Sequence, residues 1–209
     1  MNRVFPIKDK NKIEALKELL RSKKKYRDLL LFVMGINTPL HLSTILSMRW
    51  SSFLTDSWEI IKPNSKLSIK EEREKTVHIV LNSSIYEALK LYHDHYPFIS
   101  KDGYLFVSQK TKNGEPRPIT RQYVWKLLNE YAKIVGIKER IGAHTLRKTF
   151  GYHLYREGVP ISEIRKALRQ PNIISTLRYI DVNVNEYREQ KKQTVSLLQV
   201  LCKVGPEIK

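Results

Sequence analysis

The 209-residue chain is long enough for one domain with a hydrophobic core and a short appendage. Hydrophobic residues make up 41% and charged residues 28%, a globular balance that excludes a disordered chain. Lys and Arg number 38 against 21 Asp and Glu, so the net charge is +17. A charge of this size indicates a polyanionic partner, with nucleic acid ahead of an anionic membrane.

Cysteine content and hydropathy exclude further classes of protein. Cys202 is the only cysteine, so an intramolecular disulfide and a structural zinc site built on cysteines are both excluded. No apolar run approaches the ~18 residues of a membrane span. The start of the chain is rich in Lys, Glu and Asp, so we expect no signal peptide and a cytoplasmic protein.

The first part of the chain is predicted to be helical after a short arm at residues 1–8. Asp9 is a good helix cap, and apolar residues recur at helical spacing. These signals predict three helices, over residues 9–22, 26–37 and 42–48. The apolar run 29–34 predicts that the second of them is buried on most sides.

Between residues 58 and 81 the pattern changes to short runs of β-branched and apolar residues. We expect three strands in a small antiparallel sheet, over residues 58–61, 66–69 and 76–81. Pro63, Asn64 and the charged run 70–75 separate them.

Helical signals return after residue 81, with Asn82 and Thr120 as caps and Gly136 and Gly158 as stops. The predicted elements are helices over 83–96, 120–135, 145–156 and 160–169, a short turn or helix over 177–182, and a last helix over 184–204. The expected fold is therefore mostly α with a small three-stranded antiparallel β-sheet.

The candidate functional residues lie at the helix predicted over 145–156 and shortly after it in the chain. His144 and Arg147 are three positions apart and share a helix face. Histidine exchanges protons near neutral pH, arginine presents a planar fork suited to phosphate, and a downstream tyrosine can act as a nucleophile. Spacing alone does not separate this interpretation from surface or capping residues.

The amino-acid sequence of these segments is more specific than the spacing of their residues. Residues 144–153 read HTLRKTFGYH and residues 176–180 read TLRYI, and together they resemble the second half of the catalytic domain of tyrosine recombinases, the phage integrase family. Residues 35–43 (GINTPLHLS) and 46–50 (LSMRW) resemble the first half. The resemblance covers about residues 5–185. It implies the tyrosine recombinase catalytic-domain fold, double-stranded DNA as partner, and strand cleavage through a 3′-phosphotyrosyl link without metal or nucleotide cofactor.

The resemblance also implies roles for single residues. Tyr179 stands at the position of the nucleophile, while Arg147 and His144 stand at positions that contact the scissile phosphate or carry a proton. Cations elsewhere fit DNA phosphates, and we expect binding by Arg49, Lys62, Lys66, Arg121, Lys148 and Arg178.

Three positions depart from the family pattern. His41 stands where the family has its first arginine, and Gln170 in Leu-Arg-Gln stands where the family has His or Trp after Leu-Gly. The lysine of the β-hairpin aligns at Glu72 or Arg73, and Lys75 reaches the site only if the turn is rearranged. The acid-rich turn is expected to lie away from a phosphate, which it would repel.

These departures bear on activity, because losing one transition-state donor costs about 3–4 kcal/mol and effects within a catalytic unit are coupled. We predict a DNA-binding, integrase-like protein of prophage or other mobile-element origin, with weakened or lost cleavage and a role as regulator or accessory factor. An active site-specific recombinase is the alternative. A basic RNA- or protein-binding module is a second alternative, disfavoured because no aromatic RNA-recognition strand is present.

The expected organisation is an arm at 1–8, a catalytic domain at 9–182 and a helical tail at 183–209. The apolar stripe Leu197, Leu198, Leu201 and Val204 suits docking of the tail either on its own core or on a neighbouring protomer. We favour exchange between protomers, which predicts a homo-oligomer.

Overall fold

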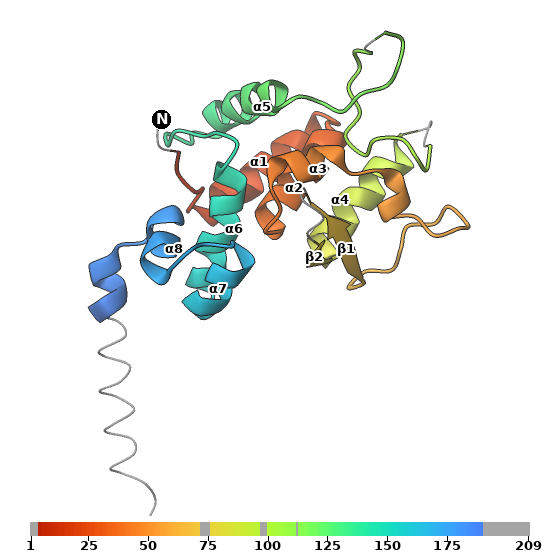
Figure 1. Ribbon diagram of the computed structural model, residues 1–209. Coiled ribbons are helices and arrows are strands. Elements are labelled where there is room, and N and C mark those ends of the chain that lie inside the picture. The colour runs from red at the N-terminus through yellow and green to blue at the C-terminus, as the bar shows by residue number, and fades with distance from the viewer. Residues whose placement is uncertain (1–3, 72–75, 97–99, 112, 190–209) are drawn as a thin grey trace, which may run out of the picture.

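The computed structural model describes residues 4–71, 76–96, 100–111 and 113–189. Its centre is helix α2 (Tyr26–Asn37), in which every residue from Asp28 to Gly35 is buried. Helices α1 (Lys10–Ser22), α3 (Leu42–Ser47), α4 (Ser83–Asp94) and α6 (Thr145–Arg156) pack around it (Figure 1). The apolar run of α2 therefore forms the middle of the main core, as its sequence predicts.

The helices begin where capping residues predict. The Asp9 side chain accepts a hydrogen bond from the Asn11 N–H at 2.8 Å, and that of Asn82 accepts one from the Ile85 N–H at 2.9 Å. Thr120 caps α5 (Arg121–Ile134) in the same way. Each cap satisfies a backbone donor that the helix itself leaves without a partner.

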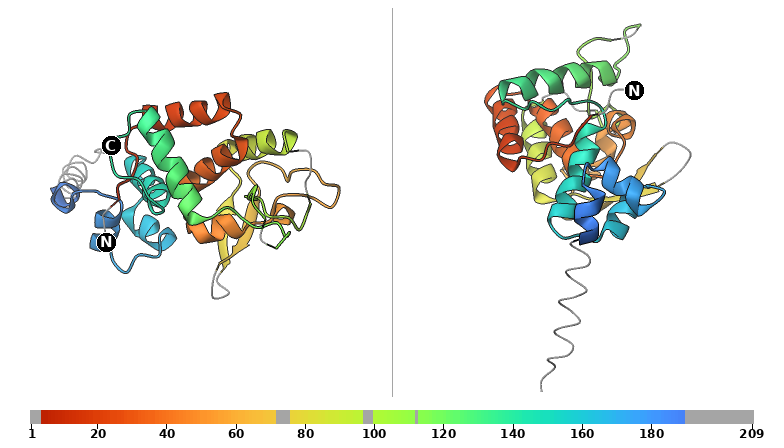
Figure 2. Two further views of the ribbon diagram at one scale, coloured as in Figure 1. Left: turned by 90° about the horizontal axis from the view of Figure 1, so that it is seen from above. Right: turned by 90° about the vertical axis from the view of Figure 1, so that its left-hand side faces the viewer.

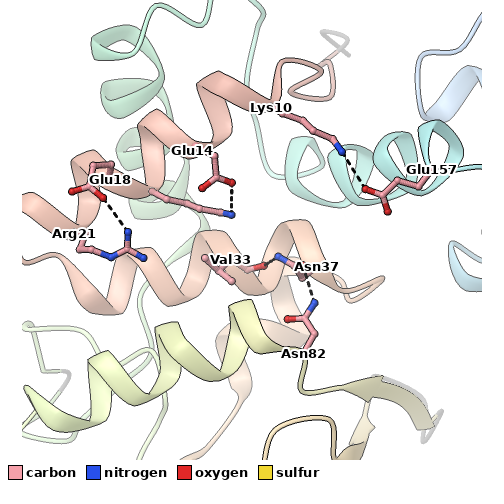
Figure 3. Close-up of polar contacts among 9 residues, drawn as sticks. Lys10, Glu14, Glu18, Arg21, Val33, Asn37, Asn82 and Glu157 are labelled. Carbon is pink, nitrogen blue, oxygen red and sulfur yellow. Dashed lines mark hydrogen bonds and ion pairs between the residues drawn. The ribbon is translucent and has the colours of Figure 1, made fainter.

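Polar contacts join the helices at their ends. The Asn82 amide donates to the Asn37 side chain at 2.9 Å, which connects the start of α4 to the end of α2 (Figure 3). Lys10 Nζ lies 3.3 Å from the Glu157 carboxylate and connects the start of α1 to the end of α6 (Figure 3). Both partners of the second contact are exposed, so it contributes little to stability.

Among the described residues, the sheet has two strands instead of the predicted three. Strands β1 (Lys66–Lys70) and β2 (Thr76–Val80) pair antiparallel, with Ile69 opposite Val77 and Leu67 opposite Ile79. The segment predicted as a first strand turns back on itself: the Thr55 N–H donates to the Glu59 carbonyl, and residue 60 makes only an isolated bridge to residue 54. Trp58 adopts a left-handed φ of 65°, which an extended strand does not contain.

A second, smaller cluster of buried side chains joins α6 to the elements that follow it. These elements lie on the side of the molecule away from α4 (Figures 1 and 2). The cluster is formed with α7 (Ile161–Ala167) and α8 (Ile173–Tyr179). The second of these begins four residues earlier than predicted, because the Asn172 side chain caps it by accepting from the Ser175 N–H. A short 3-10 helix at Trp50–Ser52 was not predicted.

The two ends of the described chain both pack near α6, the first against its side chains and the last against the second cluster. Ile7 is buried, its N–H donates to Thr149 Oγ1 at 2.9 Å, and its carbonyl lies 2.9 Å from His153 Nε2. Val184 and Tyr187, in the helical segment 184–189, pack against the second cluster. The start of the tail thus contacts its own core, whereas the apolar stripe from Leu197 to Val204 lies outside the described residues.

Within the described residues, no helix combines the length and the apolar character that crossing a membrane requires.

Candidate active site

Helix α6 carries two consecutive buried cations. Arg147 is 5% exposed and Lys148 8% exposed, and a buried charge is costly unless polar groups surround it. Arg147 Nη2 donates to the Leu168 carbonyl at 2.9 Å, and Lys148 Nζ donates to the Val4 carbonyl at 2.8 Å. Arg147 is therefore held in place by the backbone at the end of α7 and is not a solvated helix-face arginine.

Tyr179, the last residue of α8, lies against both cations. Its hydroxyl is hydrogen-bonded to the Arg147 guanidinium, and Lys148 Nζ lies 5.1 Å from the centre of its ring. Burial raises the pKa of Tyr179, and the nearby Arg147 acts in the opposite direction. Because the raised pKa keeps the phenol protonated at neutral pH, attack by its oxygen requires a group that accepts the proton.

Two histidines stand at helix N-caps and use neither side chain for capping. His41 precedes α3 and His144 precedes α6, and both are exposed. Burial, Lys148 and Arg147 lower the pKa of His144. Burial and Arg147 lower the pKa of His41, while Glu71 raises it. Both imidazoles are therefore neutral at pH 7 in the free protein and can exchange a proton when a phosphate approaches.

A small cavity of about 60 Å³ brings these groups together from three helix starts. His41, Arg121, His144 and Arg147 line it, with Leu42, Ser43 and Ala143. The His144 ring approaches the Tyr179 ring edge-on, with 6.5 Å between the ring centres. Four cations or potential cations thus surround one cavity beside a tyrosine hydroxyl, an arrangement that suits a phosphate group.

The hairpin places a carboxylate at this site, against our expectation that its acid-rich turn lies away from it. Glu71 follows β1 directly, and its side chain is only 5% exposed. One oxygen accepts from Thr44 Oγ1 at 3.3 Å and faces the His41 N–H at 3.5 Å. The other oxygen lies 2.6 Å from Arg169 Nη1.

Sequence reasoning missed Glu71 and did not count Arg169 among the site residues. The sequence signal that could have found them is a pair of opposite charges in two motifs. One is an acid in the hairpin, and the other is an arginine where the family pattern Leu-Gly-His has glycine. Nothing local connects these positions, which are 98 residues apart.

The remaining predicted site residues are distributed as follows. Gln170 is half-buried and its backbone is hydrogen-bonded to Arg165, while Arg73 and Lys75 lie outside the described residues.

The predicted DNA-binding residues differ in their surroundings. Arg121 is the first residue of α5 and lines the cavity, and Arg178, Lys62 and Lys66 are exposed. Arg49 is exposed but packs on Tyr104, 4.5 Å from its ring centre, and donates to the Asp102 carbonyl. Lys148 differs from the others because its side chain is buried against Tyr179.

Comparison of the chain with known proteins shows the family to which it belongs. The family model described as the phage integrase family matches residues 8–186, which is most of the chain. The chain is a member of the phage integrase family. The resemblance found in the short motifs therefore extends over the whole catalytic-domain pattern, and the predicted family is confirmed.

Relatives of this integrase-family chain differ in how much they share with it. It is 34% identical over 192 residues to the probable integrase/recombinase YoeC of Bacillus subtilis strain 168, spanning 92% of this chain and 97% of YoeC. It is 32% identical over 77 residues to the tyrosine recombinase XerD of Staphylococcus haemolyticus, which is 37% of this chain and 26% of XerD. Relatives thus include a protein of about the same length and longer proteins that share one part.

Solved structures confirm the fold of this integrase-family member. The crystal structure of XerA recombinase matches with a TM-score of 0.69 at 19% identity, over 92% of this chain and 66% of XerA. The XerH site-specific recombinase, in a post-cleavage complex with its difH substrate, matches with a TM-score of 0.66 at 19% identity, over 91% of this chain and 53% of XerH. The chain thus spans less than two thirds of these solved proteins, and the shared part has the tyrosine recombinase catalytic-domain fold.

Proposed function

We propose that this integrase-family protein binds double-stranded DNA, cleaves it weakly or not at all, and serves a prophage or another mobile element as a regulator or accessory factor. The net charge of +17 supports a DNA partner. The exposed Arg121, His41 and His144 surround the cavity and form the contact face for the phosphate backbone.

The observation that carries this proposal is the state of His41. Its pKa is lowered by burial and by Arg147, so it is neutral at pH 7 and offers one donor where the family pattern has a permanently charged guanidinium. Loss of one donor to the transition state typically costs about 3–4 kcal/mol, which corresponds to a rate reduction on the order of 10²–10³.

The residues that remain define the chemistry of any residual cleavage. Tyr179 Oη attacks the phosphorus and forms the 3′-phosphotyrosyl bond, the bond to the 5′-oxygen breaks, and Arg147 stabilises the charge on the non-bridging oxygens. The phenol proton is lost and the 5′-oxygen gains a proton, so the step is neutral in protons. His144, neutral and edge-on to the Tyr179 ring, is placed to exchange one of these protons.

The test uses DNA that the protein itself selects. Duplexes bound by the full chain are recovered from a random-sequence pool, and the selected sequence is remade with a nick that traps covalent intermediates. We expect retained binding with slow or absent formation of a covalent adduct, and loss of any adduct in Tyr179→Phe. Rapid and complete conversion to adduct would refute weakened cleavage, and absence of any selected or retained duplex would refute DNA binding.

A working site-specific recombinase is the second candidate. The hydrogen bond between Arg147 and the Tyr179 hydroxyl favours it, because nucleophile and phosphate-binding cation are already assembled. Adduct formation, followed by rejoining of a second duplex offered in solution, separates this candidate from the first.

We also propose that the tail at residues 183–209 contributes to a homo-oligomer on DNA. The apolar stripe Leu197, Leu198 and Leu201 supports this proposal. Light scattering of the chain with and without the selected duplex tests it, and a monomer under both conditions would contradict it.

A further inference from the structure

An ion pair connects the β-hairpin to the end of α7 beside the cavity. Arg169 follows Leu168, the C-cap of α7, and its backbone has φ of 48°, in the left-handed region. Its Nη1 lies 2.6 Å from Glu71 Oε2. The other Glu71 oxygen faces the backbone N–H of His41, so one carboxylate links Arg169 to the position that lacks the family arginine.

Arg169 and Arg147 converge at the end of the same helix. Arg147 Nη2 bonds the Leu168 carbonyl at 2.9 Å, and Arg169 is the next residue in the chain. The charge of Arg169 acts on both His41 and Arg147, whose pKa values it lowers. Two guanidinium groups therefore lie within electrostatic range of each other and of the cavity.

The two members of the ion pair differ in exposure. The Glu71 side chain is 5% exposed, whereas that of Arg169 is 39% exposed. A guanidinium carries five N–H donors in a fixed plane, so the contact with Glu71 orients the group and leaves donors on its solvent side. A buried acid that orients a half-exposed arginine is suited to present that arginine to an anion.

We propose that Arg169 supplies a second guanidinium for a DNA phosphate, in place of the arginine missing at His41, and that Glu71 is the positioning residue that aims it. This inference rests on the proposed DNA binding. It explains why an arginine occupies a left-handed position where glycine is favoured. It also gives the acidic hairpin a role at the site, because without Glu71 the long Arg169 side chain would be free to turn into solvent.

The rival explanation is a purely structural tie between hairpin and helix. A structural tie changes stability and leaves the number of phosphate contacts unaltered. A phosphate contact is measured by the salt dependence of DNA affinity, because each neutralised phosphate adds about 0.9 to the slope of log K against log salt concentration.

The experiment measures this slope for the full chain on the selected duplex. Arg169→Ala and Arg169→Gly are expected to reduce the slope by about 0.9. The glycine variant suits the left-handed backbone, so it removes the side chain without straining the turn. Lys166→Ala is the matched control: Lys166 is an exposed cation of α7 that pairs with Glu163 at 2.8 Å, and its removal is expected to leave the slope unchanged.

Glu71→Ala tests the positioning role. If Glu71 acts through Arg169, then Glu71→Ala reduces the slope by as much as Arg169→Ala, and the double variant shows no further reduction. An independent reduction in the double variant would refute the positioning role of Glu71.

His41→Arg provides a second readout that a structural tie does not affect. A guanidinium restored at position 41 is expected to return the slope of Arg169→Gly to the value of the unaltered chain. An unchanged slope in both Arg169 variants would overturn the inference while leaving DNA binding intact. Failure of the unaltered chain to bind any duplex would instead refute the proposed function, and the inference with it.

Discussion

Gly151 in the middle of α6 allows that helix to pack tightly against the ends of α7 and α8. A Cβ atom at this position would lie 2.6 Å from Leu168 Cδ1 and 2.8 Å from Ile180 Cγ2. Both neighbours are at most 1% exposed, so neither can move aside into solvent. Overpacking of this kind costs about 1–3 kcal/mol, and the better helix propensity of alanine returns about 1 kcal/mol. We therefore expect Gly151→Ala to lower the free energy of unfolding by up to about 2 kcal/mol.

The same substitution is expected to reduce cleavage, because both neighbours adjoin site residues. The Leu168 carbonyl holds Arg147, and Ile180 follows Tyr179 directly. A displacement of about 1 Å between nucleophile and phosphate-binding group lowers the rate on the order of 10²-fold. Affinity for the selected duplex is expected to change little, since the exposed Arg121 on α5 does not depend on this contact.

Urea unfolding and adduct formation on nicked DNA measure the two effects. Leu168→Ala alone removes a buried side chain and is expected to cost about 2–5 kcal/mol. In the double variant the added methyl group occupies part of the space left by Leu168, so the combined loss is expected to be smaller than the sum by at least about 0.5 kcal/mol. Strict additivity would show that the close approach does not limit this packing.

Three further predictions concern charge. His41→Arg is expected to raise the rate of adduct formation on the order of 10²-fold, as judged from the usual worth of one transition-state donor, and an unchanged rate would locate the defect elsewhere. DNA affinity is expected to rise as pH falls from 7.5 to 5.5, by up to ~10-fold per pH unit for each histidine. The reason is that a phosphate favours the protonated forms of His41 and His144, whose pKa values are lowered in the free protein. His41→Gln should weaken this pH dependence, and equal pH profiles for the variant and the unaltered chain would contradict the prediction. Asp28→Asn is expected to lower the free energy of unfolding, measured in urea, by about 3–5 kcal/mol. Asp28 is buried, and loss of its negative charge leaves the half-buried Arg27 without its ion-pair partner at 2.8 Å. A loss below about 1 kcal/mol would show that the Tyr123 hydroxyl and the Val107 carbonyl are sufficient partners for Arg27.

Local structure was largely predictable because its causes are local. Asp9, Asn82 and Thr120 cap the helices that their sequence contexts predict, since a capping side chain bonds a backbone N–H two or three positions away. The first of the three expected strands, at residues 58–61, was predicted wrongly for an equally local reason. The apolar run at residues 58–61 fits a strand, but left-handed φ at Trp58 and the hydrogen bond from Thr55 to Glu59 make it part of a turn.

The family was predictable from short motifs because these motifs contain the residues that come together at one site in the folded chain. His144 and Arg147 share one helix turn, and their spacing alone places them on one face. Tyr179 joins them only through the packing of α8 on α6, yet the wording around it was sufficient to identify its position. The sequence by itself therefore determined the family, the order of elements and three members of the candidate site.

Only the tertiary structure decided what surrounds those members. Glu71 and Arg169 are 98 residues apart and meet because the hairpin and the end of α7 come together beside the start of α3. Burial of Lys148 against Tyr179 likewise depends on where Val4 crosses α6. Spacing and propensity describe neighbours along the chain, whereas burial and Coulomb interaction depend on distance in space, and it is these two that set the charge of the candidate site.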